Sequence, residues 1–106
     1  MHIAADKVAE IIILAREEGR GEREFDAFID ALNDEERAAL VAVFWIGRGS
    51  FEAEDYQEAF ATAQQEATTP TQDYLAGSPH LADHLEAGLV ALGIDPAEAE
   101  DDLYRP

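Results

Sequence analysis

The chain has 106 residues, of which 24 are acidic and seven are basic, for a net charge of −17, and it contains no cysteine. The length predicts one domain, and an apolar content of 47% is typical of a chain that folds around a core. The charge argues against nucleic acid and anionic membranes as partners, because phosphates need cations; it permits a basic partner, or it serves solubility alone. The lack of cysteine excludes disulfides, thiolate metal sites and cysteine nucleophiles.

No basic stretch followed by an apolar run opens the sequence, so we expect no signal peptide and a cytoplasmic location.

The first third of the chain predicts two helices. Residues 5–18 have one apolar helical face, and residues 24–32 carry apolar side chains at a spacing that suits a core rather than a cofactor site. Ile13 lies off the first face, among charged side chains. It is either a single exposed isoleucine or the contact of a homodimer.

Residues 33–49 predict the helix around which the rest of the chain is arranged. Asn33 suits the N-cap, and Glu36 lies three residues later, where a capping-box partner belongs. The stretch 38–46 has no polar side chain, so every face of this helix should be buried. It is far shorter than the roughly 20 residues of a membrane span. A glycine at 47 or 49 should end the helix in the left-handed conformation.

The second half of the chain predicts a helix with a narrow, small-residue face at 53–67, one helical turn at 73–77 and a short C-terminal turn at 96–102. The expected fold is all-α: a compact bundle of about five helices around the central buried helix at 33–47.

The last main helix is expected at 79–92, with leucines on its buried face. Ser78 and Pro79 form a start signal, as N-cap and first helical residue. Gly88 lies within the helix, where a glycine often permits close contact with another helix, and Gly93 is expected to end it.

Several segments together resemble one known family. They are Trp-Ile-Gly-Arg-Gly at 45–49, Asp-Tyr-Leu-Ala-Gly-Ser-Pro at 73–79 and Asp-His-Leu-Glu-Ala-Gly-Leu at 83–89, with further similarity at 7–17. The chain resembles the bacterial family catalogued as domain of unknown function 3775. The resemblance implies a small bacterial helical protein and brings no known activity, so it assigns no catalytic residue.

Two histidines one helical turn apart form a candidate metal site. His80 and His84 at positions i and i+4 could chelate one divalent ion, with Asp83 as a further ligand or a supporting group. The zincin motif needs glutamate directly after the first histidine, where this chain has leucine. The alternative is two surface histidines on an acidic helix.

Residues 47–50, Gly-Arg-Gly-Ser, precede a helix and could bind an anion, although they lack the lysine and spacing of a P-loop. The alternative is a tight turn in which Arg48 caps the negative end of the central helix. Arg48, Asp73 and Tyr74 lie at junctions between predicted helices, near Trp45. They form either a binding groove or a network that satisfies helix ends.

The sequence offers no pairing of a nucleophile with a base, and hence no catalytic residue and no cofactor-binding residue. An enzyme is therefore the least favoured class. One hypothesis is a non-enzymatic interaction or regulatory module that engages a basic protein surface. The other is a small-ligand or divalent-metal-binding protein that uses the groove near Trp45 or the histidine pair.

Overall fold

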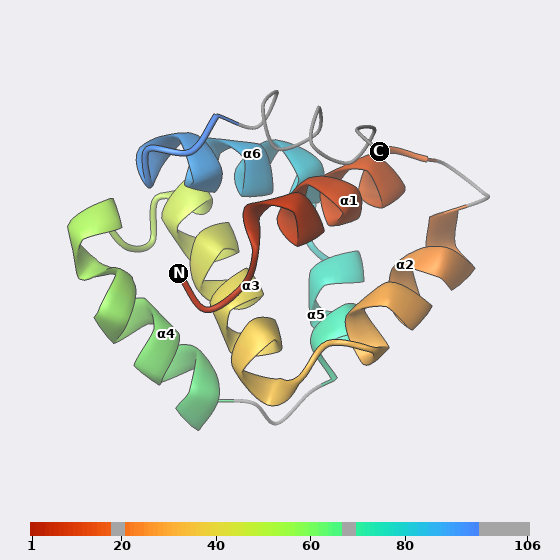
Figure 1. Cartoon of the computed structure of the whole chain (residues 1–106), viewed down its shortest axis with the longest axis horizontal. Helices are drawn as coiled ribbons and strands as arrows, with labels where there is room; N and C mark the ends of the chain where they lie inside the picture. The colour runs from red at the N-terminus through yellow and green to blue at the C-terminus, as the bar shows by residue number, and fades with distance from the viewer. Residues whose placement is uncertain (18–20, 67–69, 96–106) are drawn as a thin grey trace.

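The computed structural model describes residues 1–17, 21–66 and 70–95, and within these ranges all regular structure is helical (Figure 1). The elements are α1 (Ala5–Arg16), α2 (Gly21–Asp30), α3 (Asp34–Arg48), the 3-10 turn η1 (Ala53–Asp55), α4 (Tyr56–Gln65), α5 (Thr71–Ala76) and α6 (Leu81–Ala91). The predicted all-α bundle is confirmed. The predicted turn at 96–102 lies outside the described residues.

The helix α3 runs through the middle of the bundle (Figure 1). It packs most extensively against α6 and α4, and every residue from 38 to 46 is at most 9% exposed. Asn33 Oδ1 accepts from the Glu36 backbone N–H at 2.8 Å, and Glu36 Oε1 accepts from the Asn33 N–H at 3.1 Å. The predicted capping box and the all-round burial of this helix are both confirmed.

Two glycines let α3 and α6 cross with their backbones in contact. A Cβ on Gly88 would lie 2.2 Å from the Val43 carbonyl oxygen, and a Cβ on Gly47 would lie 1.6 Å from the His84 carbonyl oxygen. The close approach predicted at Gly88 is therefore confirmed. Gly47 is a helical residue of this crossing, and the left-handed residue that ends α3 is Gly49, with φ of 89°.

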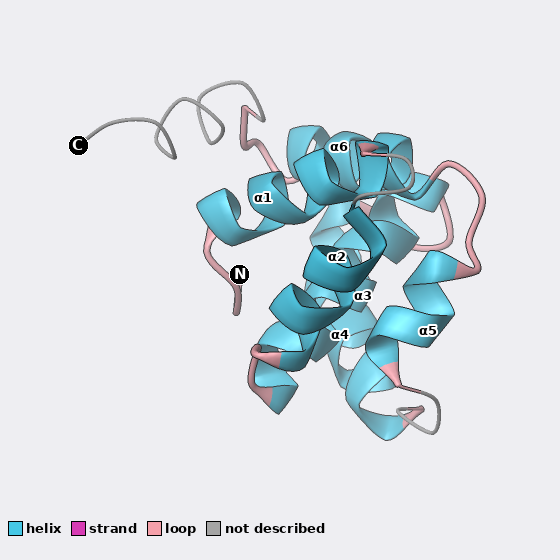
Figure 2. Cartoon of the chain, turned by 90° about the vertical axis from the view of Figure 1, so that its right-hand side faces the viewer, coloured by secondary structure: helices cyan, strands magenta, loops and turns pink. Residues whose placement is uncertain are grey.

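The helices α1 and α2 cover the core on the side of α3 away from α4 (Figure 1). α1 packs on both α6 and α2, and α2 lies beside α5 (Figure 2). Arg37 NH1 contacts three carbonyl oxygens at the C-terminal end of α2 and beyond it, those of Ile29, Asp30 and Leu32. Lys7 on α1 forms an ion pair with Glu36 on α3. Arg37 satisfies carbonyl oxygens at the end of α2 and ties α2 to α3, and Lys7 ties α1 to α3.

The predicted start of α6 is wrong. The helix begins at Leu81, and His80 precedes it with a left-handed φ of 58°. Ser78 Oγ donates instead to the Tyr74 carbonyl oxygen at 3.1 Å, so Ser78 serves the end of α5. A left-handed residue at His80 permits the turn of the chain between α5 and α6 in this short connection.

Other boundaries also differ: the helix predicted at 24–32 is α2 at Gly21–Asp30, and the helix predicted at 5–18 is α1 at Ala5–Arg16. The helix predicted at 53–67 begins with η1 before continuing as α4, and the turn predicted at 73–77 is the six-residue helix α5. Gly93 has φ of 81° and follows α6, as predicted. Within the described ranges, no helix is both long and apolar enough to cross a membrane.

Candidate functional site

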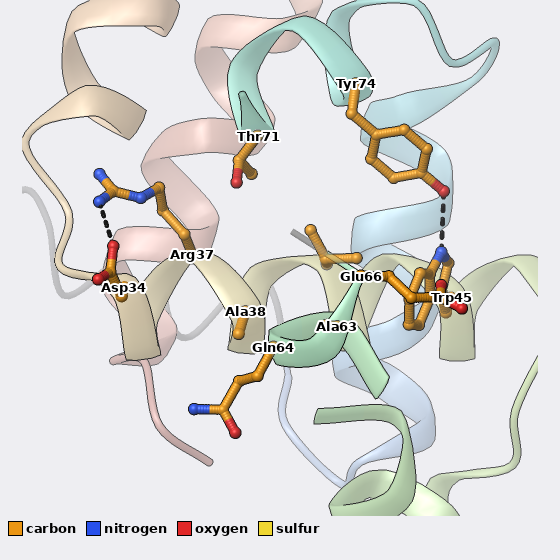
Figure 3. A pocket seen from close by; sticks show the side chains of 10 residues that line it. Asp34, Arg37, Ala38, Trp45, Ala63, Gln64, Glu66, Thr71 and Tyr74 are labelled. Atoms are coloured by element: carbon orange, nitrogen blue, oxygen red, sulfur yellow. Dashed lines mark hydrogen bonds and ion pairs between the residues drawn. The ribbon is translucent and has the colours of Figure 1, made fainter. Parts of the chain in front are cut away.

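A groove between α3, α4 and α5 contains two of the predicted site residues. We call it the Trp45 groove; its volume is about 590 Å³. Its walls include Ala38, Val41, Trp45, Ala63, Thr71 and Tyr74. Figure 3 shows Trp45 and Tyr74 together at one end, and the ion pair of Arg37 with Asp34 at the other.

A hydrogen bond joins Trp45 to Tyr74 at one end of this groove (Figure 3). Trp45 Nε1 donates to the Tyr74 hydroxyl oxygen at 2.9 Å, and only 8% of Trp45 is exposed (Figure 3). The Trp45 ring also stacks on Phe51 at 5.7 Å. Because the Tyr74 oxygen acts as the acceptor, its own hydrogen is left to be donated, and no acceptor for it is found within the described ranges.

The cation in the Trp45 groove is already engaged. Arg37 NH2 donates to Asp34 at 2.7 Å, while NH1 serves carbonyl oxygens at the end of α2. With its donors held in this way, Arg37 supports the fold and is not a free anion-binding group.

The structure does not bring Arg48 and Asp73 into the Trp45 groove. Arg48 Nε donates to Ser50 Oγ at 3.0 Å, and its guanidinium lies 5.0 Å from the centre of the Phe44 ring. Gly47 and Arg48 are the last two residues of α3, and the left-handed Gly49 ends the helix. Asp73 lines a different groove, which Trp45 does not line.

This second groove lies among α1, α2, α5 and α6, and we call it the carboxylate groove. Its volume is about 690 Å³. Its floor is apolar, with at most 9% of any side chain exposed: Leu14, Phe25, Leu81 and Ala82. Its rim holds four exposed carboxylates, Glu17, Asp26, Asp73 and Asp83. Asp26 lies on α2, Asp73 on α5 and Asp83 on α6, and Glu17 directly follows α1.

Among the described residues that line the groove, Arg16 is the one arginine or lysine beside the four carboxylates, and it is already paired. Arg16 NH2 lies 2.5 Å from Glu86 Oε2 and 3.5 Å from Asp83 Oδ1. The hydrogen bond to Glu86, opposed by partial desolvation, raises the pKa of Arg16 above its ordinary value. Glu17, Asp26 and Asp73 therefore give the groove a net negative charge over an apolar floor.

The structure places the predicted metal-site residues as follows. His80 Nδ1 lies 4.0 Å from Asp83 Oδ2, and both side chains are more than 70% exposed. His84 is half-buried with its ring edge-on to Phe44, and the two imidazole centres are 6.4 Å apart. In the part of the chain that the structure describes, no three His, Cys, Asp or Glu side chains are grouped to hold a metal ion.

Ile13, the predicted oligomer contact, is half-buried on α1. The large apolar side chains with most exposure in the described ranges are Val90 at 61% and Met1 at 46%. Sequence reasoning missed Val90, although its position beside the leucine stripe of α6 was a usable signal. It also missed the carboxylate groove, since its residues are spread over four elements.

The three segments that suggested a family meet at one junction. Trp45 bonds to Tyr74, Gly47 lies against the backbone of His84, and Ser78 bonds to the end of α5. Packing thus accounts for much of what these segments contain. Asp73 and Asp83 are different, because their carboxylates are exposed on the rim of the carboxylate groove.

These features define a small all-α protein built on one buried central helix, with a carboxylate-rimmed groove on one side. The family model described as protein of unknown function (DUF3775) matches residues 22–94, and the chain belongs to this family. The match spans α2 to α6, so the similarity noted at 7–17 lies outside it. Comparison with curated proteins and with solved structures gave no significant match.

Proposed function

We propose that this protein is a non-enzymatic interaction or regulatory module that binds a basic segment of a partner protein in the carboxylate groove. The observation that carries the proposal is the combination of an apolar floor with four carboxylates from all sides of the groove. The partner's apolar side chains would cover Leu14 and Leu81, while its lysines or arginines would meet the rim. Such charge complementarity speeds encounter and selects against acidic proteins.

The net charge of −17 supports the same proposal, because the whole surface attracts a cationic partner over a distance of about one Debye length. The apolar floor adds what charge alone lacks, namely a short-range contact that persists when salt is added. The proposal includes a cytoplasmic encounter, which localisation of a fluorescent fusion would test.

The test compares two double variants that remove equal charge from different places. Asp26→Asn with Asp73→Asn neutralises two rim carboxylates, and Glu54→Gln with Glu58→Gln neutralises two exposed carboxylates on η1 and α4. Figure 1 shows α4 on the other side of α3 from α2. The probe is a fluorescein-labelled peptide rich in lysine and leucine, followed by anisotropy at low and high salt.

Each exposed ion pair contributes about 0.2–1 kcal/mol, so the rim variant should bind the peptide about 2- to 30-fold more weakly than the parent. The control variant should stay within about twofold, because its charges act only through screened, long-range attraction. Equal weakening in both variants, or an affinity that does not fall with salt, would overturn the proposal.

A second candidate function is small-ligand binding in the Trp45 groove. The observation that favours it is the Tyr74 hydroxyl, which accepts from Trp45 and retains a hydrogen to donate inside a groove of about 590 Å³. A fragment set screened by the fluorescence of Trp45, the single tryptophan, tests it. Hits that Tyr74→Phe abolishes would support it, and an absence of hits would remove it.

Metal binding at the histidine pair is tested separately by calorimetry with zinc chloride. Heat that is lost in His84→Ala would support the pair as ligands, and an absence of heat would remove this alternative.

A further inference from the structure

The inference concerns the conformation of the partner, and it rests on the proposed function of the carboxylate groove. We infer that the groove takes a basic amphipathic α-helix, with apolar side chains along one stripe and lysine or arginine on both flanks of that stripe.

The first argument comes from backbone hydrogen bonding. The groove walls are helices, and the described ranges contain no strand whose edge could pair with an extended peptide. An extended segment on the apolar floor would leave its N–H and C=O groups without partners, at a large desolvation cost. A helix satisfies these groups internally and presents only side chains to the floor.

The second argument comes from the size and lining of the groove. A volume of about 690 Å³ is that of a pocket that holds several side chains. The floor residues Leu14, Phe25 and Leu81 come from three different helices, so the floor is a concave surface and not a slot along one helix. Apolar residues at i, i+3, i+4 and i+7 of a helix form a stripe suited to such a surface.

The third argument comes from where the charges lie. Glu17 follows α1, Asp26 is on α2 and Asp73 is on α5, so three of the four elements around the floor supply negative charge, while Asp83 on α6 lies beside Arg16. A helix seated on the floor would therefore meet negative charge along both of its flanks. Basic residues on both sides of the apolar stripe are complementary to this arrangement, whereas basic residues on one side leave half of the rim unmatched.

A second copy of this chain is a poor occupant by the same reasoning. Two molecules that each carry a charge of −17 repel one another, and the groove adds carboxylates at the point of contact. The helix therefore belongs to a different, basic protein.

The experiment uses the full chain and three labelled peptides of identical composition, rich in leucine, lysine and arginine. Each peptide contains one proline. The first peptide has the uninterrupted amphipathic helical pattern, and the second has the same residues in scrambled order. In the third peptide the proline lies at the centre and interrupts the pattern. Anisotropy gives the affinity of each, and circular dichroism gives the helicity gained on binding.

The patterned peptide should bind about tenfold or more tightly than the other two, because burial of even one leucine side chain accounts for a factor of that size. It should gain helicity when bound. Equal affinity of patterned and scrambled peptides would overturn the helical occupant while leaving the proposed function intact, and no binding of any peptide would overturn both.

A pair of variants ties the result to the groove. Ala76→Gln adds bulk at an exposed position of the groove wall, and Ala61→Gln adds the same bulk at an exposed position of α4. The first should weaken the patterned peptide several-fold and the second should not, with urea unfolding showing that both variants are folded. Equal affinities of the patterned peptide for the two variants would overturn its placement in the carboxylate groove. A concentration-dependent dimer that Ala76→Gln dissociates would also overturn it, because a second copy of the chain would then occupy the groove.

Discussion

The sharpest prediction from the structure concerns glycine-to-alanine substitutions. Gly88→Ala should lower the free energy of unfolding, whereas Gly77→Ala should leave it unchanged or raise it. In Gly88→Ala the new methyl group would lie 2.2 Å from the Val43 carbonyl oxygen and 2.8 Å from Val43 Cγ1. The carbonyl belongs to the backbone of α3, so no change of side-chain rotamer relieves the contact. The two helices would have to separate by about 1 Å at the centre of the core.

Two opposing terms set the magnitude. Alanine is favoured over glycine in a helix by about 1 kcal/mol. Overpacking a core costs about 1–3 kcal/mol, and a contact with backbone belongs at the upper end of that range. We therefore expect Gly88→Ala to destabilise the protein by about 1–2 kcal/mol, a fall in melting temperature of about 5–15 °C. Gly47→Ala should be worse, since its Cβ would lie 1.6 Å from the His84 carbonyl oxygen.

Gly77 provides the matched control. Its φ is −80°, and an added Cβ would meet nothing closer than 3.6 Å. Gly77→Ala should therefore be neutral or stabilise by about 0.4–1 kcal/mol, because alanine restricts the unfolded chain. Urea unfolding followed by Trp45 fluorescence measures all three variants, with circular dichroism as a second probe. If Gly88→Ala unfolded at the same urea concentration as the parent or a higher one, the described crossing of α3 and α6 would be refuted.

Four further predictions concern single contacts and net charge. Tyr74→Phe removes the acceptor of the nearly buried Trp45 N–H, so we expect a loss of about 1–2 kcal/mol in urea unfolding. The hydrogen bond from Lys7 holds the pKa of Glu36 below 4.5. The stability that this depression confers is present above pH 4.5 and is lost as pH falls through the folded-state value. Glu36→Gln should therefore differ from the parent at neutral pH and converge with it in acid, measured as urea midpoints. Ile13→Lys should leave the monomer folded and dissociate a dimer built on α1, read from the elution volume. Added salt should raise the melting temperature, because it screens the repulsion of a chain with charge −17.

The outcomes that would contradict these predictions are equally specific. An unchanged midpoint for Tyr74→Phe would mean that its bond with Trp45 does not form in solution. If the difference between Glu36→Gln and the parent persisted in acid, the loss would come from capping and not from charge. An unchanged elution volume for Ile13→Lys in a dimeric parent would exclude α1 as the interface. A melting temperature that is flat or falling with salt would contradict the argument from self-repulsion.

The order and type of the main helices could be predicted because they depend on local chemistry. Asn33 and Glu36 lie three residues apart, so their reciprocal bonds follow from helical geometry alone. The start of α6 shows where local reasoning fails. Ser78 and Pro79 form a valid start signal, but Ser78 serves the preceding helix and the chain turns at His80. A start signal gives no information on which of two adjacent helix ends a side chain will reach.

The candidate site, like the helices, was predictable from the sequence only in part. The proximity of Trp45 and Tyr74 was expected, and the structure adds the hydrogen bond between them. Arg48 and Asp73 were grouped with them because all lie near predicted helix ends, yet α5 presents Tyr74 and Asp73 to different grooves. Adjacent residues on a helix point about 100° apart, so sequence neighbours at a junction need not share a cavity.

Local chemistry is enough to predict helices around one apolar segment, because nine consecutive apolar residues at 38–46 cannot remain in water and leave a helix no polar face. The contact of α3 with α6 through Gly47 and Gly88, and the gathering of carboxylates from four elements around one apolar floor, become visible when the helices are packed together. Both features depend on distances between residues far apart in the chain. Such distances are set by how the helices pack on one another, and no local pattern encodes them.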